Sequence, residues 1–168
     1  LSIAIAIHCG CPLSNIKERL KFIDLPERRL AISNSLRGSI LIDDSYNSNP
    51  ASLKNAVDSL EGLERKKVCI LGDMKELGSD SQKIHQEMYE YISERVDQIF
   101  CIGDEWSTCS PNEKKDLSIF ENQDDLYSHL ISIIDKKTIL LVKGSRSTRM
   151  DLLADKLKEQ CSYLYLNT

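Results

Sequence analysis

Short apolar runs rich in β-branched residues alternate, from residue 36 onward, with stretches in which apolar residues recur every three or four positions. The runs predict β-strands at residues 39–43, 68–71, 99–102, 117–120 and 138–142, and an edge strand at 163–166. The periodic stretches predict helices near residues 53–63, 84–96, 126–134 and 150–157. This alternation is typical of an α/β fold with a mostly parallel sheet. Because the apolar runs are continuous, we expect helices on both faces of that sheet.

Two shorter helical patterns precede this region, at residues 1–9 and 12–23. A linker with two arginines, LPERRL at residues 25–30, follows them. A segment this short cannot bury enough apolar surface to fold alone. We therefore expect residues 1–28 to be a short helical arm, the remnant of a larger domain, ahead of a complete domain at residues 29–168.

Composition argues against several classes of function. A formal charge of −4 over 168 residues gives no electrostatic case for binding nucleic acid. No apolar run approaches the ~20 residues that span a bilayer, and the opening residues lack the basic leader of a signal peptide. The six cysteines show no zinc-finger spacing, so we expect reduced thiols in a cytoplasmic protein.

Three polar loops follow strands of the predicted sheet. In a parallel sheet such loops gather at one edge, where α/β proteins bind ligands. The loop within ILIDDSYNSNP, residues 40–50, places two carboxylates, a tyrosine and two asparagines in seven residues. These side chains suit a ligand site and equally a solvated turn that caps the next helix, because Asp, Ser and Asn favour both.

The loop KGSRS, residues 143–147, follows a buried strand and opens a helix. Backbone N–H groups and the helix dipole favour an anion there, and Arg146 can bind a carboxylate or phosphate through two parallel hydrogen bonds. Alternatively, Ser145 or Ser147 caps the helix and both cations are solvated. The loop is not a Walker A motif, because G-x-x-x-x-G-K-[ST] is absent from the sequence.

The third loop, at residues 72–78, carries Asp73 and Glu76, which could hold an amine or a metal. Alternatively it is a surface loop with glycines at positive φ. His85 follows on the next helix and is expected to be structural or exposed, and Trp106 is expected to cover the edge of the sheet.

Together, DDSYNSNPASLKNAVDSL, ILGDMKELG and LVKGSRSTRMD resemble, in order and spacing, the C-terminal part of the ATP-dependent Mur ligases of peptidoglycan synthesis. The loops are most similar to those of the branch that adds D-alanyl-D-alanine to UDP-MurNAc-tripeptide. The resemblance covers essentially the whole chain. It implies a Rossmann-like C-terminal domain preceded by the end of a central ATPase domain.

The resemblance also implies the chemistry: ATP phosphorylates the tripeptide carboxylate, and the dipeptide amine attacks the acyl phosphate. ATP and Mg²⁺ would be held mainly by the central domain, whose P-loop lysine and metal ligands have no counterpart in this sequence. The chain is therefore expected to be inactive alone, with no catalytic or metal-binding residue of its own.

By position, the resemblance implies that five residues bind the nucleotide: Arg29, Asp44, Tyr46, Asn47 and Asn49. Arg29 would reach the ATP phosphates from the linker, and Asp44 would accept hydrogen bonds from the ribose. The family usually has a small residue where this chain has Arg28, so either arginine could face ATP.

The resemblance places Lys143, Ser145 and Arg146 near the incoming dipeptide, whose carboxylate is the anion expected at this loop. Asp73 is implied as a further residue on the same edge. Two other interpretations stay open: a stand-alone α/β module that binds a small anionic ligand, with residues 1–25 packed tightly on it, or a sibling Mur ligase or folylpolyglutamate synthetase.

Overall fold

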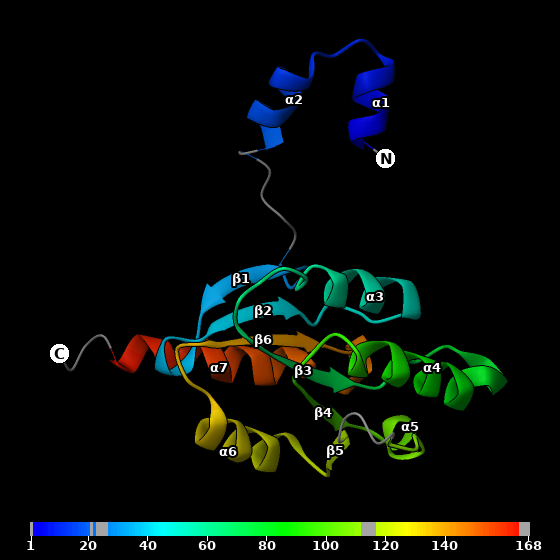
Figure 1. Ribbon diagram of the computed structural model, residues 1–168, viewed down its shortest axis with the longest axis vertical. Helices are drawn as coiled ribbons and strands as arrows, with labels where there is room; N and C mark the ends of the chain where they lie inside the picture. Colours follow the sequence, from blue (N-terminus) through cyan, green and yellow to red (C-terminus); the bar gives the residue numbers. More distant parts are fainter. Residues whose placement is uncertain (1, 21, 23–26, 112–116, 165–168) are drawn as a thin grey trace.

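A six-stranded sheet forms the centre of the protein (Figure 1). The computed structural model describes residues 2–20, 22, 27–111 and 117–164, except the side chains of residues 2 and 159–164. The strands are β1 (Ala31–Asn34), β2 (Ile40–Asp44), β3 (Lys66–Gly72), β4 (Gln98–Ile102), β5 (Leu117–Phe120) and β6 (Thr138–Lys143). Their order in the sheet is β1-β2-β6-β3-β4-β5. β1 is antiparallel to β2 and all other neighbours are parallel, which confirms the expected α/β class.

Helices cover both faces of the sheet, as the continuous apolar runs predict. The helices are α1 (Ser2–His8), α2 (Leu13–Leu20), α3 (Pro50–Asp58), α4 (Ser81–Ser93), α5 (Asp104–Ser107), α6 (Gln123–Ile133) and α7 (Met150–Leu164). Short 3₁₀ helices lie at η1 (Leu36–Gly38), η2 (Gly78–Asp80) and η3 (Arg146–Thr148). One face packs against α3, α4 and α5 through Leu53, Met88 and Trp106. The other face packs against α6 and α7 through Leu130 and Leu153.

Successive residues of the central strand β6 point to opposite faces of the sheet. Ile139 and Leu141 belong to the cluster under α3 and α4, whereas Leu140 and Val142 belong to the cluster under α6 and α7. All four side chains are at most 2% exposed. Because side chains alternate along a strand, covering both faces requires an apolar residue at every position.

The strand order brings three loops together at the carboxyl edge of the sheet. β6 lies between β2 and β3, and Lys143 at its end is paired with Asp44 on one side and with Leu71 on the other. The loops that follow β2, β6 and β3 therefore begin side by side. Asp44 and Lys143 are neighbours there although 99 positions separate them in the sequence.

Two elements differ from the predictions. β1 is not predicted, because its residues AISN include only one large apolar side chain, Ile32, which is 73% exposed. β1 instead depends on backbone pairing with β2. The predicted strand at 163–166 is wrong where the structure describes it, because Tyr163 and Leu164 continue α7, whose sequence contains no Gly or Pro to end the helix. Residues 165–166 lie outside the described residues, as do residues 23, 25–26 and 112–115 of other predicted segments.

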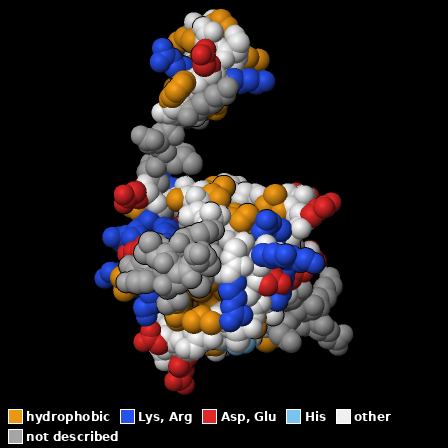
Figure 2. Space-filling model, turned by 90° about the vertical axis from the view of Figure 1, so that its left-hand side faces the viewer, with side chains coloured by type: hydrophobic (Ala, Val, Ile, Leu, Met, Phe, Trp, Pro, Cys, Tyr) orange, Lys and Arg blue, Asp and Glu red, His pale blue; other side chains and the backbone are white. Residues whose placement is uncertain are grey.

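The first two helices pack on each other and lie apart from the sheet in Figures 1 and 2. Ile16 of α2 is buried, whereas Ile3, Ile5 and Ile7 of α1 are 45–54% exposed. The arm thus presents apolar side chains to solvent. None of the helices that the structure describes combines the length and the apolar character needed to cross a membrane.

Two neighbouring leucines of α7 provide a matched test of the core. Leu153 is fully buried under the sheet, whereas Leu152 is 45% exposed. Because deleting buried methyl groups leaves a cavity, Leu153→Ala should lower the free energy of unfolding by about 2–5 kcal/mol. Leu152→Ala should change it by less than about 1 kcal/mol. Urea denaturation of the two variants measures both values, and equal losses would contradict the packing of α7 described here.

Candidate functional site

Two adjoining cavities lie at the carboxyl edge of the sheet. The tyrosine cavity, about 520 Å³, is lined by Arg29, Leu30, Asp44, Tyr46, Asn47, Asn49, Ser52 and Lys143. The arginine cavity, about 650 Å³, is lined by Asn47, Ser48, Asn49, Lys75, Glu76, Leu77, Ser145, Arg146, Ser147 and Arg149. Asn47 and Asn49 belong to both, so the loop after β2 forms the wall between them. That wall is held firmly, because Asn49 caps α3 through a reciprocal pair of hydrogen bonds with Ser52.

A cation stacked on an aromatic ring forms one side of the tyrosine cavity. The guanidinium carbon of Arg29 lies 4.4 Å from the centroid of the Tyr46 ring, and Tyr46 is 47% exposed. No carboxylate pairs with Arg29 among the residues that the structure describes. The guanidinium N–H groups therefore stay available to an anion, and the exposed ring offers a stacking surface.

The two linker arginines have different partners. Arg28 donates hydrogen bonds to the main-chain oxygen of Asp151, at 3.0 Å, and to Oδ2 of Asp155, at 2.7 Å. The hydrogen bond to Asp155 raises the pKa of Arg28 above its usual value. The Arg28 carbonyl accepts a hydrogen bond from the N–H of Tyr46. Arg28 thus fixes the linker to α7 and the β2 loop, and Arg29 is the arginine that lines the cavity.

A buried ion pair joins the ends of β2 and β6. Nζ of Lys143, whose side chain is 2% exposed, donates hydrogen bonds to Oδ2 of Asp44 at 2.5 Å and to the carbonyl of Asn47 at 2.9 Å. The N–H of Leu30 donates to the other Asp44 oxygen at 3.1 Å. Each carboxylate oxygen can accept more than one hydrogen bond, so Asp44 keeps acceptor capacity toward the tyrosine cavity. Lys143 lies in the wall of this cavity, away from the lining of the arginine cavity.

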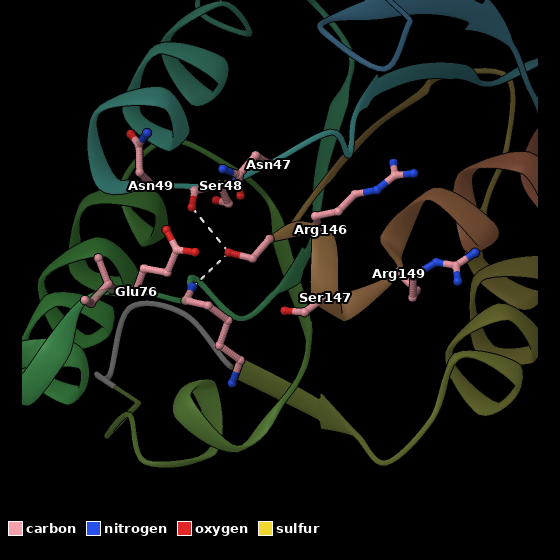
Figure 3. A pocket seen from close by; sticks show the side chains of 10 residues that line it. Asn47, Ser48, Asn49, Glu76, Arg146, Ser147 and Arg149 are labelled. Carbon is pink, nitrogen blue, oxygen red and sulfur yellow. Dashed lines mark hydrogen bonds between the residues drawn. The ribbon is translucent and has the colours of Figure 1, made fainter.

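Ser145 joins all three loops at the floor of the arginine cavity. Its hydroxyl accepts a hydrogen bond from the N–H of Lys75 at 2.8 Å and donates one to the carbonyl of Ser48 at 3.4 Å (Figure 3). Its own N–H donates to the carbonyl of Asp73 at 3.0 Å. Gly144 precedes it, and a Cβ there would lie 2.6 Å from Oγ1 of Thr148, so the close turn requires glycine. Ser145 makes no side-chain cap bond at η3, and the side chain of Ser147 has no hydrogen-bond partner among the described residues, so neither serine caps the helix that follows.

Three cations line the arginine cavity, and each has a carboxylate partner. Nε of Arg149 lies 3.2 Å from Asp151, and a terminal nitrogen of Arg146 lies 3.9 Å from the same carboxylate. Lys75 pairs with Asp73 at 2.8 Å, and this hydrogen bond raises the pKa of Lys75. Lys75 and Arg149 were not singled out from the sequence. Lys75 lies within the polar loop at residues 72–78, and Arg149 lies two residues beyond the loop at 143–147.

Asp73 lines neither cavity. Its side chain is nearly buried, accepts hydrogen bonds from Lys75 and from the N–H of Trp106, and packs against Gly103, where no Cβ would fit. Trp106 is fully buried in the core cluster on the face of the sheet that α3, α4 and α5 cover. Asp73 therefore holds the loop after β3 against the start of α5. It contacts the lining of the arginine cavity through its carbonyl, which binds Ser145, and through its carboxylate, which binds Lys75.

His85 has the structural role expected for it. The ring is fully buried, Nε2 accepts a hydrogen bond from the N–H of Met74 at 3.0 Å, and Nδ1 lies 2.8 Å from the carbonyl of Ser81. These two bonds specify a neutral imidazole with its hydrogen on Nδ1. His85 thus holds the loop that carries Lys75 and Glu76. Among the described residues, no group of three or more His, Cys, Asp and Glu could hold a metal ion.

Removing one oxygen atom tests the junction of the three loops. Ser145→Ala should cost about 1–2 kcal/mol of stability and expose the Lys75 amide to exchange, because that N–H loses its acceptor. Ser147→Ala is the control, since Ser147 lines the same cavity without a hydrogen-bond partner among the described residues. Hydrogen exchange monitored by NMR measures the effect. Unchanged Lys75 protection in Ser145→Ala would contradict the assigned contact.

Known relatives match this chain over nearly its whole length. A protein of Haemophilus influenzae named UDP-N-acetylmuramoyl-tripeptide--D-alanyl-D-alanine ligase is 32% identical over 94% of this chain and 35% of its own length. The protein of the same name from Buchnera aphidicola subsp. Acyrthosiphon pisum is 37% identical over 88% of this chain and 33% of its own length. The chain therefore spans about a third of the length of these relatives.

Solved structures share the fold. The MurF ligase of Thermotoga maritima in complex with ADP superposes with a TM-score of 0.81 at 21% identity, over 96% of this chain and 37% of that one. MurF from Acinetobacter baumannii superposes with a TM-score of 0.79 at 30% identity, over 94% of this chain and 35% of that one. The family model described as Mur ligase, glutamate ligase domain matches residues 28–146, which include both cavities except Ser147 and Arg149. With most of its length matched by that model, the chain belongs to the Mur ligase, glutamate ligase domain family.

Proposed function

We propose that this chain is the C-terminal domain of an ATP-dependent ligase that joins D-alanyl-D-alanine to UDP-MurNAc-tripeptide in peptidoglycan synthesis. The observation that carries the proposal is the pair of adjoining cavities with a shared wall. One cavity has the stacked Arg29–Tyr46 pair and the other is rich in cations. A ligase of this kind must bring a nucleotide and an amine-bearing substrate together, and two cavities separated by one loop suit that task.

The tyrosine cavity is the proposed nucleotide site, because its lining includes all five residues implied to bind ATP: Arg29, Asp44, Tyr46, Asn47 and Asn49. The exposed ring of Tyr46 can pack on the nucleoside, and Arg29 can bind phosphate oxygens. Asp44 can accept hydrogen bonds from ribose hydroxyls with the lone pairs that Lys143 and Leu30 leave unused.

The arginine cavity is the proposed dipeptide site. Arg146, with 62% of its side chain exposed, binds the dipeptide carboxylate. Ser145 holds the three loops in place and lines the same cavity. Lys143 lines the tyrosine cavity and acts on the wall between the cavities through the carbonyl of Asn47, and Asp73 acts through Ser145 and Lys75 as a positioning residue.

In the proposed reaction, the tripeptide carboxylate takes a phosphoryl group from ATP, and the dipeptide amine then displaces phosphate to form an amide. Magnesium would offset the phosphate charge. The described residues offer no metal cluster and the sequence contains no P-loop. We therefore propose that other parts of the parent enzyme hold the metal and make most of the phosphate contacts, and that this chain alone does not catalyse ligation. The reaction belongs to the cytoplasm and serves cell shape and division.

We also propose that residues 1–28 belong to the end of a central ATPase domain and the linker, and residues 29–168 to the C-terminal domain. The support is the exposed isoleucines of α1, which lie apart from the sheet. A stand-alone module would instead require this arm to pack tightly on the domain.

The ring of Tyr46 provides a test of the nucleotide site. Tyr46→Ala should weaken binding of ADP by about 1–3 kcal/mol, because the stacking surface is lost. Tyr46→Phe keeps the ring and should bind within a factor of about two of the original chain. An NMR titration that follows the amides of the β2 loop measures both dissociation constants. Equal affinity of the Ala variant and the original chain would exclude the ring from the nucleotide site.

Competing ligands test the proposed function as a whole. D-alanyl-D-alanine should shift the amide signals of Ser145, Arg146 and Ser147 at lower concentration than D-alanine or L-glutamate does, because the cavity is large enough for a dipeptide. A preference for L-glutamate would favour a sibling ligase of the folylpolyglutamate type. Ligation of both substrates by this chain alone, measured as ADP release, would overturn the assignment of the chemistry to the rest of the enzyme.

A further inference from the structure

The backbone at Glu76 is held in an unusual conformation. Its φ is 64°, in the left-handed region that costs a residue with a Cβ about 1–2 kcal/mol. The neighbouring residues are fixed. Met74 is fully buried and hydrogen-bonded to His85, and the N–H of Lys75 is bound to Ser145. Leu77 packs against the core on the other side. Strain of this kind persists where the surroundings determine it, and it is common at ligand sites.

This conformation places a carboxylate without a partner in the arginine cavity. Glu76 lines the cavity, and no hydrogen bond or ion pair holds its side chain among the residues that the structure describes. The cations of the same cavity are already paired, Lys75 with Asp73 and both Arg146 and Arg149 with Asp151. Glu76 is thus the cavity's only unpaired carboxylate within the described part of the chain.

The charges of the cavity are separated in space. Figure 3 shows the Glu76 carboxylate on the side of Ser48 and Asn49, with Arg146 and Arg149 toward the other side of the cavity. The two arginines share the single charge of Asp151 and their side chains are 62% and 56% exposed, so positive charge remains at their end of the cavity. A simple anion would gain no favourable contact from Glu76, and a metal ion would be repelled by the three cations of the cavity. A zwitterion suits both ends.

We propose that Glu76 binds the ammonium group of a zwitterionic dipeptide whose carboxylate lies at Arg146 and Arg149. This inference rests on the proposed function and specifies the direction in which the substrate lies. The ammonium end then lies beside Asn49, which also lines the tyrosine cavity, and so points the reacting nitrogen toward the nucleotide. The strained loop thereby selects substrates with a free amine.

Ligands with one blocked end test this assignment on the full 168-residue chain. NMR titrations would use D-alanyl-D-alanine, its N-acetyl derivative and its C-terminal amide. Blocking either end of the dipeptide removes a charge-assisted hydrogen bond. N-acetylation should therefore weaken binding to the original chain by about 10- to 100-fold. Glu76→Gln should weaken binding of the free dipeptide by a similar factor and leave the affinity of the N-acetyl derivative unchanged. Glu87→Gln, an exposed carboxylate on α4, is the control and should change neither.

Three results would overturn the inference. They are equal binding of the free and N-acetylated dipeptides by the original chain, unaltered affinity in Glu76→Gln, and no signal change with any zwitterion at its solubility limit. The proposed function can fail separately. Glycylglycine or an amino acid could bind more tightly than D-alanyl-D-alanine while Glu76→Gln still removes the discrimination against a blocked amine. In that case the role of Glu76 stands and the assigned substrate is wrong.

Discussion

The buried ammonium group of Lys143 is the interaction on which the site depends. A lysine that is 2% exposed must be paired, because an unpaired charge in that position costs several kcal/mol. Its partners are the carboxylate of Asp44, the last residue of β2, and the carbonyl of Asn47 in the loop that follows. The pair therefore fixes the loop that separates the two cavities. The contact exists only because β6 lies beside β2, so the topology of the sheet and the geometry of the site are set together.

Around this pair, the fold uses short polar contacts where the loops meet and apolar contacts elsewhere. Ser145 joins the three loops through its hydroxyl and its N–H. His85 holds the loop after β3 by accepting a hydrogen bond from the N–H of Met74. The side chains that face the cavities, such as Tyr46, Glu76 and Arg149, are in contrast exposed. A rigid frame of buried polar groups thus presents adaptable charged groups to a ligand, which is the arrangement that binding sites require.

Much of this arrangement could be predicted from the sequence, because continuous apolar runs mark strands buried on both faces and polar residues at their ends mark the ligand edge. The sequence pattern does not reveal β1, whose exposed Ile32 gives no burial signal, nor the continuation of α7 through Tyr163. Lys143 lines the tyrosine cavity, whereas Ser145 and Arg146 line the arginine cavity. This separation depends on the directions in which side chains point at the end of β6. The buried position of the Asp73 side chain, outside both cavities, depends on α5, a one-turn helix without periodicity.

The tyrosine cavity is coupled to the conformation of the linker. The carbonyl of Arg28 accepts the Tyr46 N–H while the side chain of Arg29 stacks on the Tyr46 ring, so one tyrosine is held by two successive linker residues. Any reorientation of Arg28 and Arg29 must either carry Tyr46 along or break these contacts. Occupancy of the tyrosine cavity and the conformation of these two residues are therefore thermodynamically linked, and a ligand that favours one conformation must bind more tightly when that conformation is imposed.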